Sequence, residues 1–88
     1  MCAKEKINRI TVKIFNDEYT IKGNAEVRHI QKVAGYVHEQ MKNLSLKNPY
    51  LPPTKVAVLT SVNMADDLLR LKEDYEALVK LLDEENKG

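Results

Sequence analysis

The sequence predicts an α+β chain in ββαα order: a small head made of a β-hairpin and one helix, then a long C-terminal helix that forms an intermolecular coiled coil. Three observations predict it. Apolar residues alternate near the N-terminus, recur every three or four residues in the middle, and keep a regular 4–3 spacing toward the C-terminus. These are the periods of a strand, an amphipathic helix and a coiled coil. We expect the head at residues 1–53 and the long helix at 54–88.

A β-hairpin is predicted at about residues 7–22. Two short runs alternate apolar with polar residues, as strands with one buried face do. Asn16 and Asp17 separate the runs. Both residue types tolerate the positive φ of a tight turn, so we expect the turn there. The alternating apolar residues are Ile10, Val12, Ile14, Tyr19 and Ile21.

The first helix is predicted at about residues 25–46, with Asn24 as its N-cap. Gly35 lies inside it and costs about 1 kcal/mol relative to alanine, which close helix packing at that point would explain. The apolar face has the spacing of an amphipathic helix, and its residues are Val27, Ile30, Ala34, Val37, Met41 and Leu44.

Prolines at 49, 52 and 53 predict the end of the first helix. Thr54 is a candidate N-cap for the next helix, and so short a connection usually joins antiparallel helices. We expect the first half of the last helix to pack on the head. Asn63 in this apolar half has two readings: a buried side chain that fixes packing, or an exposed helix position.

The second half of the last helix predicts self-association. At 1.5 Å per residue this helix is about 50 Å long and the first only about 33 Å, so one chain cannot cover its apolar side. A partner chain would bury it, giving a dimer or a tetramer; a frayed helix in a monomer is the alternative. The expected oligomerisation residues are Met64, Leu68, Leu71, Tyr75, Leu78, Val79 and Leu82.

Composition argues against several functions. The net charge of +1 and the 6% aromatic content do not favour binding to nucleic acid. No run is long enough to span a membrane. The single cysteine, Cys2, excludes an intrachain disulfide and is expected to be a terminal residue without a role. The chain is therefore expected to be cytosolic.

No pattern predicts catalysis, a metal site or a cofactor. His29 and His38 are nine residues apart in the first helix, on nearly opposite faces, so they cannot chelate one metal ion within a chain. Both are expected to be helix-surface residues. The three glycines, at 23, 35 and 88, form no phosphate-binding loop. We therefore expect no enzyme activity.

The order of these elements and their residues resembles the ZapA family of bacterial cell division proteins. The resemblance covers residues 7–85 and rests on residues 10–15 (ITVKIF), 19–21 (YTI) and 55–63 (KVAVLTSVN). Residues 48–51 (NPYL) are similar to the short form found in Gram-positive bacteria. Family members usually carry glycine at the hairpin turn, where this chain has Asn16.

The resemblance implies a non-enzymatic adaptor that binds FtsZ, cross-links and stabilises its filaments, and promotes assembly of the division ring at mid-cell. It also implies dimers that pair into antiparallel tetramers through the C-terminal coil, with no cofactor. FtsZ is acidic in this picture, and residues 1–48 carry a net charge of +4 against −3 for residues 49–88. The expected FtsZ-binding residues are Arg9, Lys13, Asp17, Glu18 and Lys22 on the hairpin, with Lys42, Lys47 and Lys55 near the inter-helix turn.

The alternative is a ribbon–helix–helix-like DNA-binding regulator, which also has a strand followed by two helices. Such proteins pair one short strand from each of two chains to read the major groove. A hairpin within one chain, a very long last helix and a low net charge all disfavour this class.

Overall fold

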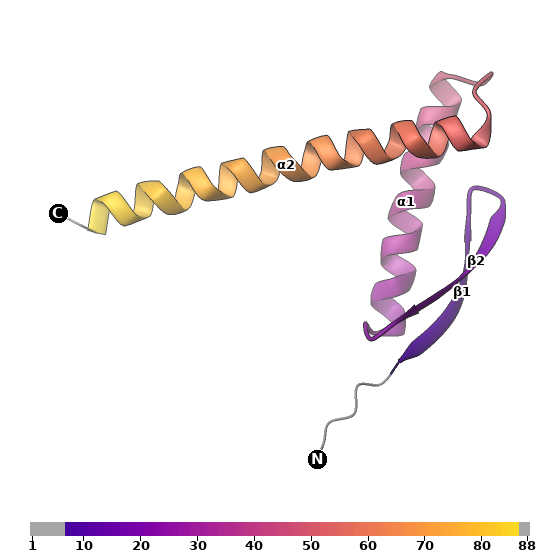
Figure 1. Ribbon diagram of the computed structural model, residues 1–88, viewed down its shortest axis with the longest axis horizontal. Helices are drawn as coiled ribbons and strands as arrows, with labels where there is room; N and C mark the ends of the chain where they lie inside the picture. Colours follow the sequence, from indigo (N-terminus) through magenta and orange to yellow (C-terminus); the bar gives the residue numbers. More distant parts are fainter. Residues whose placement is uncertain (1–6, 87–88) are drawn as a thin grey trace, which may run out of the picture.

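The computed structural model describes residues 7–86, so Cys2 lies outside the described residues. The elements are β1 (Asn8–Ile14), β2 (Asp17–Gly23), α1 (Val27–Lys47) and α2 (Pro53–Asn86). The α+β class, the ββαα order and the long last helix are thereby confirmed. In Figure 1 the hairpin lies along α1, while α2 leaves these elements and extends well past them. We use "head" for β1, β2 and α1 together.

The hairpin is antiparallel and its turn contains Phe15 and Asn16, because Ile14 pairs with Asp17. The prediction of a turn at Asn16 and Asp17 was wrong by one residue. That register would have placed Phe15 in the strand, on the same polar side as Lys13. In the observed register Phe15 joins the turn, where its side chain faces the helices. The apolar alternation is as predicted, with Val12 opposite Tyr19 and Ile10 opposite Ile21.

The start of α1 also differs from the prediction. Its N-cap is Glu26, without a side-chain capping hydrogen bond, so Asn24 is not the cap. Asn8 contributes instead, since its Nδ2 donates to the carbonyl oxygen of Ala25 over 2.7 Å. This bond ties the first residue of β1 to the chain entering the helix and fixes the direction in which α1 leaves the hairpin.

The end of α1 is closed by Asn48. Its backbone N–H donates to the carbonyl oxygens of Leu44 and Ser45, and its side-chain Nδ2 donates to Leu44 as well. These bonds satisfy carbonyl groups that the end of a helix leaves without partners. The last of the three prolines, Pro53, is the first residue of α2, a position that proline favours. Thr54 therefore lies inside the helix and does not cap it.

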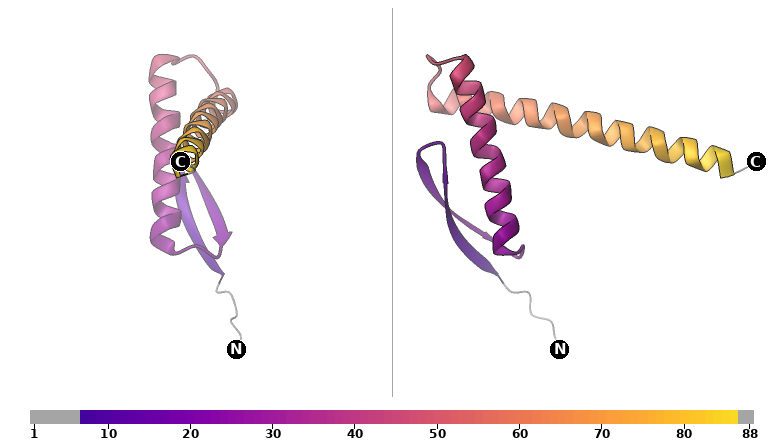
Figure 2. Two further views of the ribbon diagram at one scale, coloured as in Figure 1. Left: turned by 90° about the vertical axis from the view of Figure 1, so that its left-hand side faces the viewer. Right: turned by 180° about the vertical axis from the view of Figure 1, so that it is seen from behind.

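The two helices cross steeply, and the expectation that they run antiparallel was wrong (Figures 1 and 2). The hairpin already covers the apolar side of α1, so α2 meets α1 only near its own first turns. The small core lies between the hairpin and α1, and the start of α2 closes it at one end (Figure 1). Its buried residues are Val12, Ile30, Ala34, Met41, Val56 and Thr60.

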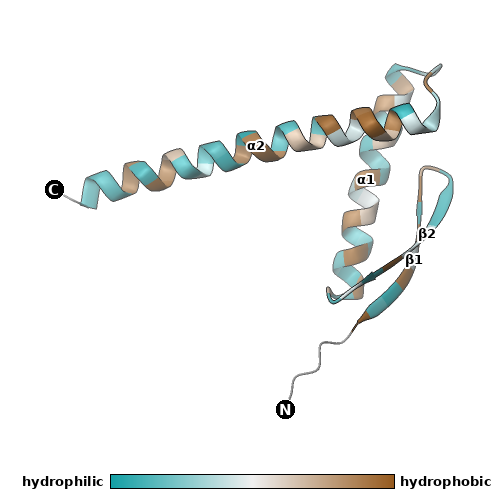
Figure 3. Ribbon diagram, in the orientation of Figure 1, coloured by the Kyte–Doolittle hydropathy of each residue, from teal (hydrophilic) through white to brown (hydrophobic). Residues whose placement is uncertain are grey.

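Beyond this crossing, α2 has no neighbour in the described chain. Figure 3 shows hydrophobic positions recurring along its whole length, including the part that projects from the head. The described residues measure 55 × 47 × 16 Å, so the molecule is flat and extended. No helix among the described residues is long and apolar enough to cross a membrane. Asn63 is exposed, which favours the second of its two readings.

Gly35 does not make the close contact that its position inside a helix suggested. Apart from the nearby backbone of α1 itself, a Cβ added there would meet no atom of the described residues within 4 Å. Within one chain, therefore, packing does not explain the glycine.

Candidate functional site

The candidate site has two parts: an uncovered apolar surface on α2 and charged surfaces on the head. We call the first part the α2 stripe. Met64 is half-buried at the crossing with α1, and the other side chains are 45% to 67% exposed. A contiguous apolar surface of this kind marks a site of association. The α2 stripe comprises Met64, Leu68, Leu71, Tyr75, Leu78, Val79 and Leu82.

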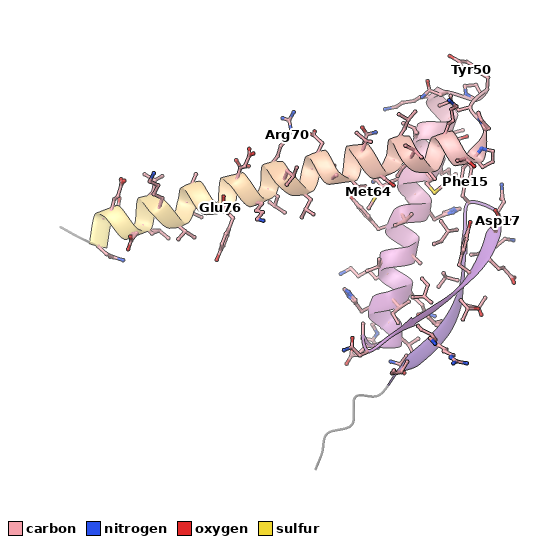
Figure 4. The ribbon with its side chains drawn as sticks, viewed as in Figure 1. Phe15, Asp17, Tyr50, Met64, Arg70 and Glu76 are labelled. Carbon is pink, nitrogen blue, oxygen red and sulfur yellow. The ribbon has the colours of Figure 1, made fainter. Side chains whose placement is uncertain are left out.

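The α2 stripe continues onto α1 where the two helices cross. A groove of about 390 Å³ lies between Tyr36 of α1 and the residues Met64, Ala65, Asp67, Leu68 and Leu71 of α2. Tyr36 is 51% exposed, and Figure 4 shows Met64 at the crossing, between α2 and the head. This apolar surface therefore begins at the crossing, beside Tyr36 of α1, and runs out along the projecting helix.

A second apolar groove, of about 650 Å³, separates the hairpin from the first turns of α2. We call it the hairpin groove. Phe15 and Asp17 lie at the tip of the hairpin, beside the start of α2 (Figure 4). The groove's lining residues are Ile14, Phe15, Asp17, Tyr19, Thr20, Ile21, Met41, Pro53, Thr54, Ala57 and Val58.

Four charged residues of the hairpin lie along its outer face. Arg9 is directly opposite Lys22, and Lys13 is directly opposite Glu18. All four are exposed, as is Asp17 at the turn. The pairing of Arg9 with Lys22 concentrates positive charge at the end of the hairpin away from its turn, whereas Lys13 faces an opposite charge. The predicted FtsZ-binding residues of the hairpin therefore lie on one element, but they do not form a surface of one charge.

The second predicted set lies around the connection between the helices. Lys42 and Lys47 are in the last two turns of α1, Lys55 is in the first turn of α2, and all three are exposed. Lys47 also complements the negative end of the α1 dipole. The hairpin turn lies beside the start of α2 (Figure 1). These three lysines are therefore at the same end of the head as Asp17 and Glu18. Arg9 and Lys22 lie at the other end.

His38 is not the helix-surface residue that the sequence predicted. It is half-buried, and its Nδ1 accepts a hydrogen bond from the backbone N–H of Phe15 over 2.9 Å. The sequence contains a pattern that indicates this position. His38 lies four residues after Ala34 and three before Met41, both of which are buried, so it is on the buried side of α1. His29, in contrast, is exposed as expected.

Thr60 is a second residue that the sequence did not single out. It is buried in α2 at the crossing, and its hydroxyl oxygen has no hydrogen-bond partner among the described residues. The neighbouring Ser61 bonds back to the carbonyl oxygen of Ala57 over 2.9 Å. Among residues 7–86, no three His, Cys, Asp or Glu side chains lie where they could hold a metal ion together.

These features define a class of protein: a small ββαα head that carries a long, uncovered apolar helix for self-association. The family model described as "Cell division protein ZapA" matches residues 10–87. The chain belongs to the ZapA family of cell division proteins. Its fold and its Gram-positive relatives confirm the resemblance found in the sequence.

Relatives at the level of sequence and structure agree. The ZapA of Geobacillus sp. strain WCH70 is 41% identical over 83 residues, or 94% of this chain and 95% of that protein. The ZapA of Geobacillus kaustophilus is 44% identical over 80 residues, or 91% and 88% of the two chains. A solved ZapA mutant dimer from Geobacillus stearothermophilus is 37% identical with a TM-score of 0.75, covering 94% of this chain and 96% of that one. Membership and this dimer support a role in cell division and self-association.

Proposed function

We propose that this chain is a non-enzymatic adaptor that binds FtsZ, cross-links its filaments and promotes assembly of the division ring. It acts in the cytoplasm, at the mid-cell division site, without a cofactor. Its working parts are the head and the long helix α2. The observation that carries the proposal is the uncovered α2 stripe, which gives a partner-binding head the means to become multivalent.

Cross-linking needs at least two heads on one particle. A dimer has two heads, and two dimers joined antiparallel along the α2 stripe place heads at both ends of a shared coil. Val79 and Leu81 are exposed beside the regular seam of the projecting part of α2. They widen its apolar arc beyond what a single partner helix covers. Linked heads bind a filament array tightly even when each single contact is weak. We therefore propose a tetramer as the active form.

The charged surfaces of the head are the proposed contact with FtsZ. Arg9 and Lys22 form a basic pair at one end of the hairpin, and Lys42, Lys47 and Lys55 form a basic group at the other end of the head. Lys13, Asp17 and Glu18 complete the proposed surface. Exposed charges of this kind steer association and select an acidic partner.

Co-sedimentation with GTP-assembled FtsZ tests this contact. One variant reverses Arg9, Lys13 and Lys22 to Glu, and a second reverses Lys42, Lys47 and Lys55. The matched control reverses Arg28 and Lys32, which are exposed on α1 outside both groups. At about 0.1–0.15 M salt, where surface charge still acts, we expect the wild type and the control to pellet with FtsZ and at least one variant to stay in the supernatant. Pelleting of both variants would contradict the electrostatic contact.

The DNA-binding alternative is separated by a gel-shift assay with random duplex DNA. In this chain β1 pairs with β2 of the same molecule, whereas ribbon–helix–helix regulators pair strands between chains. We expect no shift at protein concentrations that saturate FtsZ.

A further inference from the structure

The hairpin turn places a bulky side chain in an unfavourable backbone conformation. Phe15 has φ 50° and Asn16 has φ 77°, as in the two-residue turns with positive φ at both positions that suit hairpins. Such turns favour Asn and Gly. A bulky residue such as Phe is rarely found at positive φ because its Cβ crowds the backbone. The turn therefore depends on contacts from outside the hairpin.

His38 supplies one such contact. The N–H of the first turn residue has no partner in the strand ladder, since the last pair of the hairpin is Ile14 with Asp17. In this chain the N–H of Phe15 donates to Nδ1 of His38, 23 residues along the chain and half-buried on α1. This hydrogen bond joins the strained end of the hairpin to the helix beneath it.

The bond requires a neutral imidazole. A ring nitrogen accepts a hydrogen bond only when it carries no proton, so Nδ1 must be unprotonated and the proton must lie on Nε2. When the ring gains a second proton, both nitrogens become donors. Nδ1–H would then face the N–H of Phe15, and the hydrogen bond would be replaced by a repulsive contact.

We propose that His38 is a positioning residue and a pH-sensitive latch: the neutral ring holds the hairpin turn against α1, and protonation releases it. The latch is closed when Nδ1 carries no proton and open when it carries one.

The charged groups around His38 do not take the place of its hydrogen bond to Phe15. Among residues 7–86, His38 forms no ion pair. The charged groups of the elements at this end of the head comprise three carboxylates and four ammonium groups, so negative charge is not in excess there. They are Asp17, Glu18 and Glu39, with Lys13, Lys42, Lys47 and Lys55.

Release of the turn would change the hairpin groove. Phe15 and Asp17 line that groove together with Pro53 and Thr54 of α2. When the N–H of Phe15 loses its acceptor, the strained turn is free to relax away from α1. The width of the groove and the position of Asp17 and Glu18 would then depend on the protonation of one side chain that lies outside the groove.

Amide hydrogen exchange of Phe15, measured by NMR on the full chain from about pH 8 to about pH 5, tests the latch. The readout is the protection factor, which removes the intrinsic pH dependence of exchange. In the wild type we expect Phe15 to lose about fivefold to tenfold protection toward acid, the size of one ordinary hydrogen bond. His29→Gln, at an exposed position of the same helix, should behave as the wild type does.

Two variants at position 38 make the test specific. In His38→Gln the amide oxygen can accept the same bond at every pH, so protection should no longer depend on pH. In His38→Ala, protection should be low throughout. If His38→Ala does not fold, His38→Gln still decides. A wild type whose Phe15 protection is constant with pH, or a His38→Gln chain that loses protection as the wild type does, would overturn the proposal.

Discussion

Ile14 and Asp17 face each other as the last pair of the hairpin, which leaves Phe15 and Asn16 as the whole turn. Both turn residues have positive φ, and Asn16 is at the second position, where glycine is preferred. Backbone geometry therefore favours glycine at this position, and this chain keeps the geometry with the next best residue for it.

Asn16→Gly should stabilise the protein by about 0.5 kcal/mol. Relief of the positive φ gains up to about 1 kcal/mol, and the greater freedom of glycine in the unfolded chain removes part of that gain. The midpoint of urea unfolding at fixed protein concentration measures the effect. The control is Asn24→Gly, because Asn24 is not at positive φ and the same change there should destabilise. A lower midpoint for Asn16→Gly would contradict the turn geometry.

Thr60→Val should raise stability by about 1 kcal/mol. The Thr60 hydroxyl is buried at the helix crossing without a partner, and an unsatisfied buried polar group costs about 1–3 kcal/mol. Valine fills nearly the same space without the hydroxyl. Thr54→Val, at an exposed position in the first turn of α2, should change stability by less than about 0.5 kcal/mol. If Thr60→Val destabilises, the hydroxyl must have a partner in the assembled protein.

Gly35→Ala tests whether Gly35 is packed against a partner chain in the assembled protein. Apart from the nearby backbone of α1 itself, no atom of the described residues lies within 4 Å of the added Cβ, so alanine should stabilise α1 by about 1 kcal/mol through its helix propensity. Thermal unfolding and light scattering on the same samples measure stability and mass. A loss of stability together with a lower mass would mean that a partner chain packs against Gly35.

The α2 stripe predicts the assembly state. Leu71→Glu combined with Leu78→Glu places two charges in the middle of the stripe, where a partner helix would bury them at high cost. We expect the tetramer to fall to a dimer by light scattering. Lys80→Glu is the control, since it changes the net charge by the same two units on the opposite side of the helix and should leave the mass unchanged. A tetramer in the double variant would show that assembly uses another surface.

The strands and helices could be predicted because their periods are set by which side chains must be buried. Ile10, Val12 and Ile14 define a strand face wherever the turn lies. The exact turn could not be predicted, since Asn16 fits two registers and the choice depends on Phe15 packing against the helices.

The parts of the site that follow from a regular spacing of apolar residues could be predicted. The parts that depend on contacts between distant residues could not. The α2 stripe follows from spacing alone. The steep crossing of α1 and α2 does not, because it depends on how much of α1 the hairpin covers. His38 could be placed on the buried side of α1 from its spacing, but its bond to Phe15 joins residues 23 positions apart and requires the folded chain.

Electron microscopy of FtsZ assembled with GTP tests whether this chain cross-links filaments through α2. We expect lateral bundles with the wild type and with Lys80→Glu. With the Leu71→Glu, Leu78→Glu variant we expect mainly separate filaments, even though some protein still pellets with them. Bundles that persist with this variant, or wild-type protein that leaves the filaments single, would contradict cross-linking through α2.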